Sequence, residues 1–576
     1  MVVTPQTTAQ TTVEARQRGR EIAFVSSTMG LVALAVLIPF FFKGDASGHD
    51  FEFHVASWME VARQWHEGVF YPRWAALANF GFGEPRFIFY PPASWMLGAA
   101  LSLVLPWKIV PAAYIWLVLL VAGWSMYRLG REWLSVRVAV GAGALFAANP
   151  YHLLMVYWRS DLAELLASAV FPLLVLATLN VTREFRRGPL VIALLIAFIW
   201  LTNAPAGVIG SYSTALLLFV LGVIQRSVRP LIYGFGAVAL GIALAAFYLV
   251  PAMFEQSWVQ IAQVLSSGLR PQDNFLFTVT SDPEHTAFNF LASEVAIGMF
   301  AALALAVGFA SPLKQRSRPL WAMLSTLSIV CVILMVPVSN VLWTYLPKLR
   351  FVQFPWRWLF PLAVAMAAFV VTAIRRLGDT PRILISIVAI AALLTCGWLL
   401  EKGTWWDPDG VADLQAAILE RGTGYEGVDE YAPRDSDNSN LNKNGPRVAE
   451  VAPFWQIQRL RAGTVDIQSW YSEHKAFTVM IPRPVTLGLR LLNYPAWHVD
   501  INGRTVAPRS SPGTGQVLID VPAGTSHIRL DFIRTPDRTW GAILSFIALI
   551  VWGVLLWRSR GLKETTAEPS HTITPV

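Results

Sequence analysis

The amino-acid sequence predicts a polytopic α-helical membrane protein with about 12 transmembrane helices and a C-terminal extracytoplasmic β-sandwich-like domain before the last of them. Of the 576 residues, 55% are hydrophobic and only 14% are charged, and the apolar residues gather into long runs. Such a composition is typical of a chain that crosses a membrane several times. In the second half of one polar segment, residues 401–538, apolar and polar residues instead alternate as in strands.

Runs of about 20 apolar residues indicate membrane-spanning helices. The predicted spans are, in chain order, 22–42, 109–127, 136–149, 162–180, 189–203, 206–224, 231–250, 293–310, 319–338, 358–374, 383–400 and 539–557. The shorter run 93–106 is flanked by prolines, so we interpret it as a re-entrant or juxtamembrane helix that does not cross. The polar ends, residues 1–20 and 562–576, are predicted to be disordered.

Basic residues predict how these spans are oriented. They cluster in seven connectors: Arg16/Arg18/Arg20, Arg128/Arg131/Arg137, Arg183/Arg186/Arg187, Arg226/Arg229, Lys314/Arg316/Arg318, Arg375/Arg376/Arg382 and Arg558/Arg560/Lys563. With twelve spans and no crossing at 93–106, all seven connectors face the cytoplasm, as the positive-inside rule requires. The net charge of +8 then reports membrane topology, and we expect no nucleic-acid partner.

This orientation divides the chain into five parts. They are a cytoplasmic tail (1–21), a transmembrane bundle (22–400) with extracytoplasmic loops 43–108 and 251–292, an extracytoplasmic β-rich domain (401–538), a final span (539–557) and a second cytoplasmic tail (558–576). The β-rich domain contains KAFTVMIP, VTLGLRLLNYPAW and GQVLIDVPAG, and its Asn502–Gly503 pair is typical of a hairpin turn. Cys331 and Cys396 lie inside apolar runs, which argues against a disulfide framework or a cysteine metal site.

The first extracytoplasmic loop opens with an acidic and imidazole cluster. If residues from 50 onward are helical, Asp50 and His54 lie one turn apart on one face, while Glu52 points away. A carboxylate and an imidazole so placed could act as a base or share a metal ion. The alternative is structural, because Ser47-x-x-Asp50 matches a capping box and Asp50 could itself cap the helix.

Further charged residues follow in the same loop. Arg73, Glu84 and Arg86 lie among aromatic residues in YPRW and FGFGEPRFIFYPP. They could reach a phosphate or a sugar. Anchoring at the membrane interface is the alternative, and it accounts for the aromatic residues better than for arginines on the non-cytoplasmic side.

Two later segments place cations at the mouths of spans. YHLLMVYWRSDLAE contains Tyr157, Arg159 and Asp161, for which a neutralising Arg–Asp pair is as good an explanation as a direct role. KLRFVQFPWRWLF contains Arg357, which could bind an anionic lipid phosphate or stack on Trp356 or Trp358. No Walker A loop, HExxH, GxSxG or Rossmann glycine pattern occurs, and few acids lie in the spans, which weakens an ion-coupled transporter.

Several of these motifs resemble those of a known superfamily. HDFEFH (49–54), YPRW (71–74), NFGFGEP (79–85) and FYPP (89–92) resemble the GT-C membrane glycosyltransferases. With QFPWRW (353–358), TGYEGVDEYAPR (423–434) and YPAWHVDING (494–503), the chain looks like the bacterial polytopic membrane proteins labelled "6-pyruvoyl-tetrahydropterin synthase-related". Pterin chemistry is not implied, because a pterin synthase needs a His-x-His pair for zinc and this sequence has none.

The GT-C resemblance implies a GT-C-like bundle that transfers a sugar from a polyprenyl-phosphate donor to a lipid, glycan or protein acceptor. The reaction would take place on the extracytoplasmic face of a bacterial inner membrane. An acidic residue of the first loop would be catalytic, here Asp50 with Glu52 second, and Asp50 and His54 are candidate ligands of a divalent metal ion. Arg159, Arg270 and Arg357 would bind the donor phosphate. Candidate substrate contacts are Arg73, Glu84, Arg86, Tyr157, Asp161, Trp497 and His498.

Two other functions stay open at this point. The protein could transport or flip a lipid-linked glycan, which would require hydrophilic groups facing each other deep in the bundle. It could also be a non-catalytic scaffold that presents the β-rich domain outside the cell. The sequence places most of its polar residues outside the spans, which favours transfer over transport.

Overall fold

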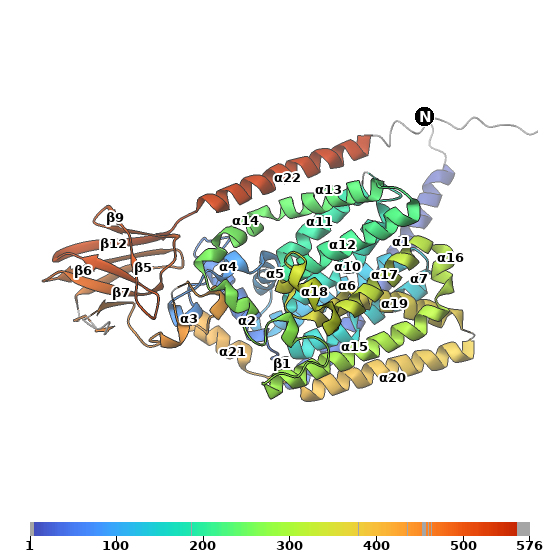
Figure 1. Cartoon of the computed structure of the whole chain (residues 1–576), viewed down its shortest axis with the longest axis horizontal. Coiled ribbons are helices and arrows are strands. Elements are labelled where there is room, and N and C mark those ends of the chain that lie inside the picture. The colour runs from blue at the N-terminus through green and yellow to red at the C-terminus, as the bar shows by residue number, and fades with distance from the viewer. Residues whose placement is uncertain are drawn as a thin grey trace, which may run out of the picture.

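The computed structural model describes residues 5–561, apart from residues 186, 378, 435, 452–456, 459 and 462. A helical bundle makes up most of the chain, and a β-sandwich lies at one end of it (Figure 1). The N-terminal end of α1 and the C-terminal end of α22 lie at the opposite end of the bundle. This arrangement confirms the predicted class, a helical membrane protein with a C-terminal β domain.

Long apolar helices form the bundle. In chain order they are α1 (Pro5–Lys43), α6 (Val110–Gly130), α7 (Val136–Ala147), α8 (Pro150–Leu154), α9 (Leu162–Ala169), α10 (Phe171–Asn180), α11 (Gly188–Thr202), α12 (Ala204–Gln225), α13 (Arg229–Leu244), α14 (Ala246–Glu255), α15 (Pro283–Phe309), α16 (Ser311–Arg316), α17 (Arg318–Leu334), α18 (Asn340–Tyr345), α19 (Leu359–Arg376), α20 (Asp379–Gly403) and α22 (Pro536–Gly561). The outer loops contribute α2 (Phe51–His66), α3 (Ala78–Gly81), α4 (Arg86–Phe89), α5 (Pro92–Ser102) and α21 (Gly410–Gln415).

The predicted count of twelve spans is not confirmed. Among the described residues, 9 helices are long and apolar enough to cross a membrane, or up to 11 if each of two bent pairs is one span. The bent pairs break by 71° between α13 and α14 and by 92° after α17, where we predicted the straight spans 231–250 and 319–338. The remaining predicted span, 189–203, corresponds to α11, which has only 15 residues.

The chain ends also differ from expectation. Helix α1 begins at Pro5, so residues 5–20, which we predicted to be disordered, continue the first span as helix. The predicted disordered end 562–576 lies outside the described residues, as do the connector residues Arg186 and Lys563.

Two antiparallel five-stranded sheets form the sandwich, in the orders β10-β11-β7-β3-β4 and β5-β6-β12-β8-β9. Their strands are β3 (Val448–Val451), β4 (Ile457–Gln458), β5 (Val465–Trp470), β6 (His474–Ile481), β7 (Val485–Leu492), β8 (Trp497–Ile501), β9 (Arg504–Val506), β10 (Arg509–Ser510), β11 (Gln516–Val521) and β12 (Gly524–Phe532). Asn502 and Gly503 join β8 to β9 with φ angles of 52° and 76°, values that a tight two-residue hairpin turn requires.

Residues 404–447, which we call the connecting segment, do not belong to the sandwich. Its strand β2 (Trp406–Asp407) pairs with β1 (Asp45–Ala46), directly after α1, and α21 packs against α2. The connecting segment therefore contacts the loop that follows α1, through β1 and α2.

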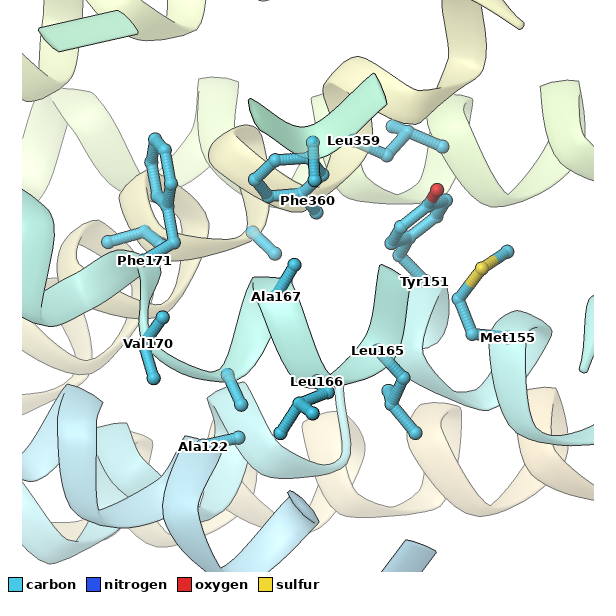
Figure 2. Close-up of a cluster of buried hydrophobic side chains, with 14 of the residues drawn as sticks. Ala122, Tyr151, Met155, Leu165, Leu166, Ala167, Val170, Phe171, Leu359 and Phe360 are labelled. Carbon is cyan, nitrogen blue, oxygen red and sulfur yellow. The ribbon is translucent and has the colours of Figure 1, made fainter. Parts of the chain in front are cut away.

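Helices α9 and α10 lie at the centre of the bundle. The span that they form is 89% buried, whereas the span of α20 is 6% buried. Figure 2 shows Leu165, Leu166 and Val170 facing neighbouring helices, and the rings of Phe171 and Phe360 meet edge to face at 5.2 Å. This packing fixes the N-terminal end of α9, where charged residues project.

Candidate functional site

The charged side chains near the N-terminal end of α9 include Asp50, which lies at the start of α2. Asp50 occupies the N-cap position but makes no side-chain capping hydrogen bond. Its carboxylate instead accepts a hydrogen bond of 2.6 Å from Arg159 Nη1. The backbone N–H groups of His49 and Asp50 donate to the carbonyls of Trp158 and Arg159, at 3.1 and 3.0 Å. The loop and the end of the α8 segment are thus joined, and the carboxylate is directed away from its own helix.

His54 lies one turn further along α2, on the same side. Its Nε2 accepts a hydrogen bond of 3.1 Å from the N–H of Leu162 and lies 3.8 Å from Asp161 Oδ1. Both side chains are buried. One ligand-type atom from each of Asp50, His54 and Asp161 lies within 4.8 Å of the others. Two carboxylates and one imidazole are a donor set that suits Mn²⁺ or Zn²⁺.

Arg357 completes the arrangement from the segment that precedes α19. Its Nη2 donates to Asp161 at 3.0 Å, and its Nε donates to Glu164 at 2.7 Å. A third hydrogen bond, of 2.9 Å, goes from Nη1 to the carbonyl of Val352. The guanidinium lies 4.8 Å from the ring centre of Phe354, so the aromatic partner is this ring and not the expected Trp356 or Trp358.

We call these six residues the loop–bundle cluster: Asp50, His54, Arg159, Asp161, Glu164 and Arg357. It holds three carboxylates and two guanidinium groups. The side chains of Asp161, Glu164 and Arg357 are no more than 4% exposed, whereas Asp50 is 29% and Arg159 13% exposed. The cluster therefore has a closed inner part and an open outer pair.

Burial and charge act in opposite directions on Asp161. Burial would raise the pKa of its carboxyl group, but the neighbouring His54 side chain and the guanidinium of Arg357 together hold the pKa below its ordinary value. Asp161 is therefore ionised at neutral pH. Its carboxylate also caps α9 by accepting a 2.9 Å hydrogen bond from the N–H of Glu164.

Aromatic rings surround the open pair. The ring of His49 lies 4.9 Å from that of Phe288 on α15, and Phe288 lies 5.6 Å from Trp356. On the other side, Tyr90 packs edge-on against His54, with 5.9 Å between ring centres. Burial, followed by the nearby charge of Arg159, lowers the pKa of His49.

Sequence reasoning missed Glu430 and did not select Glu164 as a site residue. Glu430 lies in the connecting segment, between Val428, whose N–H donates to Glu84 at 3.0 Å, and Tyr431, whose ring stacks on Phe89 at 5.7 Å. Burial raises the pKa of Glu430, and the carboxylates of Glu84 and Asp50 add to that rise. Within the described part of the chain, Glu430 has no ion-pair partner. The acidic residue could be seen in the motif TGYEGVDEYAPR, but the sequence did not show that this motif lies beside the first loop.

The remaining expected residues lie outside the cluster. Glu84 and Arg86 form a fully buried pair at 2.7 Å, and Arg86 also donates to Ser57 at 3.0 Å. The guanidinium of Arg73 lies over the ring of Tyr71, 4.4 Å from its centre. Burial lowers the pKa of Arg73. These three side chains hold the first loop together.

Other expected residues are spread more widely. Glu52 is exposed, and the hydroxyl of Tyr157 donates to the carbonyl of Val36 on α1. Arg270 is 48% exposed and pairs with Asp273 three residues later at 3.0 Å. On the sandwich, Trp497 packs edge-on against Trp74 at 5.6 Å, and His498 lies 3.6 Å from Asp500.

Three solved structures are similar to this chain. They are the archaeal oligosaccharyltransferase AglB from Archaeoglobus fulgidus in complex with an inhibitory peptide and a dolichol-phosphate (13% identity, TM-score 0.40, 72% of this chain and 57% of that chain), ArnT from Cupriavidus metallidurans bound to undecaprenyl phosphate (12%, 0.39, 66% and 64%) and the arabinofuranosyltransferase AftD from Mycobacteria (17%, 0.42, 65% and 26%). The chain spans less than two thirds of the length of each, and TM-scores below 0.5 carry no argument about its activity. No curated protein matches the chain.

A family model gives a clearer result. The model described as "6-pyruvoyl-tetrahydropterin synthase related domain; membrane protein" matches residues 87–402, more than half of the chain. The matched range includes Arg159, Asp161, Glu164 and Arg357 but begins after Asp50 and His54. This multi-pass membrane protein therefore belongs to the 6-pyruvoyl-tetrahydropterin synthase related domain family.

Proposed function

We propose that the protein is a membrane glycosyltransferase that transfers a sugar from a polyprenyl-phosphate donor to a lipid, glycan or protein acceptor. Transfer would take place on the extracytoplasmic face of a bacterial inner membrane. The observation that carries the proposal is the loop–bundle cluster. It combines an open Asp50–Arg159 pair with a closed Asp161–Arg357–Glu164 set at the end of apolar helices. Sugar transfer from a lipid phosphate needs both a carboxylate that can accept a proton and cations that can bind the phosphate.

The chemistry follows from the charges. In transfer, the acceptor hydroxyl loses its proton, its oxygen forms a bond to the sugar, and the bond between the sugar and the donor phosphate breaks with its electrons on the phosphate. Arg159 would bind that phosphate and stabilise its growing negative charge. A phosphate that takes the place of Asp50 on Arg159 would release the Asp50 carboxylate to accept the proton. Arg357 adds positive charge behind this pair.

The same residues fit a divalent metal ion. Asp50, His54 and Asp161 would hold it, and a bound metal would supply further positive charge for the phosphate. A metal site here predicts that Mn²⁺ or Zn²⁺ binds the purified protein and that binding is lost on His54→Ala, as measured by calorimetry in the absence of any donor.

The direct test is transfer by the full-length protein in lipid nanodiscs supplied with a panel of polyprenyl-phosphate sugars. Asp50→Asn should lower release of polyprenyl phosphate by about 10²–10⁴-fold, the usual contribution of a general base. Thermal stability should change little, because Asp50 makes no capping bond and the asparagine oxygen can still accept a hydrogen bond from Arg159. Glu52→Gln is the matched control, because this exposed carboxylate lies on the same helix and points away. Normal transfer by Asp50→Asn, or lipid flipping without any glycan product, would refute the proposal.

A further inference from the structure

A cleft of about 410 Å³ lies between the sandwich, the end of α14 and the connecting segment. Its walls come from separate parts of the chain and include Trp258, Arg434, Asn493, Tyr494, Trp497 and Ser510. Of these residues the sequence indicated only Trp497 as a candidate substrate contact, because the others come together with it only when the sandwich is docked on the membrane half. Its volume is in the range of small-molecule binding sites.

The walls of the cleft are held in place. The hydroxyl of Tyr494 donates to Glu255 at 2.6 Å, and Arg538 donates to both oxygens of Glu255 at 2.7 and 2.9 Å. This buried set joins the sandwich to α14 and α22. The backbone N–H of Arg434 donates to the carbonyl of Trp258 at 3.0 Å. The cleft is therefore formed before any ligand arrives, which reduces the entropic cost of binding.

A glycine allows two walls to approach each other closely. Gly515 has a φ angle of +71°, and a Cβ at this position would lie 2.4 Å from the Cβ of Ser436. Any other residue would push the sandwich away from the connecting segment and widen the cleft.

The lining chemistry restricts the occupant. Among the described lining residues there is no Leu, Ile, Val, Met or Phe, so an isoprenoid chain would find aliphatic surface only on Pro433, Pro495 and Pro508. Nor is there an aspartate or glutamate, and the only cation among them is Arg434, which disfavours a positively charged ligand. The rest of the lining offers mainly aromatic rings, serine hydroxyls and the Asn493 amide. A sugar matches this mixture, because it presents C–H groups to aromatic faces and hydroxyls to polar groups.

The cleft is connected to the loop–bundle cluster by a short stretch of chain. Arg434 follows Tyr431 by three residues, and the ring of Tyr431 stacks on that of Phe89. Tyr90, which follows Phe89 in the sequence, packs against His54 of the loop–bundle cluster. We propose that the cleft binds a sugar unit of a glycan acceptor, neutral or carrying a carboxylate, while another part of that acceptor reaches Asp50. This assignment of the acceptor class rests on the proposed function.

Binding can be measured without turnover. Saturation-transfer NMR on the full chain in nanodiscs would use cellobiose, maltose, lactose and cellobiouronic acid as probes, with farnesyl phosphate as the lipid comparison. We expect at least one disaccharide to show a saturation-transfer signal from the protein. Trp258→Ala and Arg434→Ala should each reduce that signal at least fivefold. Arg434 has an exposed side chain, so its variant should fold even if the tryptophan variant does not. Arg509→Ala, an exposed arginine of β10 that pairs with Asp520 and does not line the cleft, is the matched control.

The outcomes separate the two proposals. Disaccharide binding that persists in Asp50→Asn supports the cleft even if no sugar transfer is ever found. If sugar transfer depends on Asp50 but no disaccharide binds, the cleft assignment is overturned and the proposed function stands. Equal binding by Arg434→Ala and the unsubstituted protein, or binding of farnesyl phosphate only, would also overturn it.

Discussion

The loop–bundle cluster and the set that joins the sandwich to the bundle are built from the same groups but are balanced differently. In the second set, which we call the sandwich anchor, Glu255, Arg538 and Tyr494 form one closed unit. Two hydrogen bonds of 2.7 and 2.9 Å link a single carboxylate to a single guanidinium, and both side chains are no more than 3% exposed. In the cluster, three carboxylates share two guanidinium groups, and one pair is open.

This difference indicates a structural role for the sandwich anchor and a reactive role for the loop–bundle cluster. A buried, fully paired carboxylate and guanidinium cannot take up a new partner without losing an existing one, so the anchor holds two parts of the chain in one geometry. The cluster has a surplus carboxylate and an open pair, so a phosphate or a hydroxyl can enter by exchange. Breaking the anchor should therefore lower stability, and altering the cluster should lower activity.

The largest effect is expected for Asp161→Asn. Asparagine caps a helix about as well as aspartate, so α9 should keep its N-terminal hydrogen bond. Arg357 loses the charge of one of its two carboxylate partners but keeps its hydrogen bonds to Glu164 and to the carbonyl of Val352, so the fold should be retained. We expect sugar transfer to fall by about 10²–10⁴-fold while the melting temperature changes little. If Asp161 served only as a cap, this variant would transfer sugar at the normal rate.

The anchor should behave in the opposite way. Glu255→Ala leaves Arg538 buried without its partner, which should lower the free energy of unfolding by about 3–5 kcal/mol, measured by denaturant unfolding in nanodiscs. Replacing both partners, Glu255→Met with Arg538→Leu, should restore most of the loss, because apolar side chains of similar size need no charge partner. A double variant as unstable as the single one would show that the anchor is not a closed pair.

Much of the fold could be predicted from the sequence because it depends on local patterns. Apolar runs indicate helices, and alternation together with Asn502–Gly503 indicates the sandwich. The number of spans could not be predicted, since the bends of 71° and 92° depend on packing between helices and not on local composition.

The candidate site was only partly accessible to sequence reasoning. Asp50 and His54 are four residues apart, so a helix places them on one face. Arg357 is almost two hundred residues from Asp161, and their contact depends on how the segment before α19 packs against α9. Arg270 seemed equal to Arg357 in the sequence, but it pairs with its own neighbour Asp273. The sequence shows which residues are charged, but it does not show which distant residue each of them pairs with.

Another buried carboxylate, Asp45, tests the comparison with the smallest expected effect. Asp45 on β1 lies directly opposite Asp407 on β2 and is 8% exposed. It has neither the closed partner of the anchor nor the open pair of the cluster. Burial, and then the charge of Asp407, raises the pKa of Asp45 from 3.8 to about 7. Between these two values the folded protein keeps a proton that the unfolded chain releases.

The pairing of β1 with β2 should therefore weaken as pH rises from about 4 to about 7 and stay weak above that, by no more than about 4 kcal/mol for a shift of this size. Asp45→Asn should remove the dependence and strengthen the pairing at pH 8, as read from hydrogen exchange at Ser47, whose N–H donates to the carbonyl of Trp405 at 2.9 Å, after correction for the intrinsic exchange rate. Asp413→Asn, which removes an exposed carboxylate of α21, should leave the profile unchanged. A flat profile in the unsubstituted protein would mean that a cation neutralises Asp45, so that this carboxylate would resemble the paired Glu255 of the sandwich anchor.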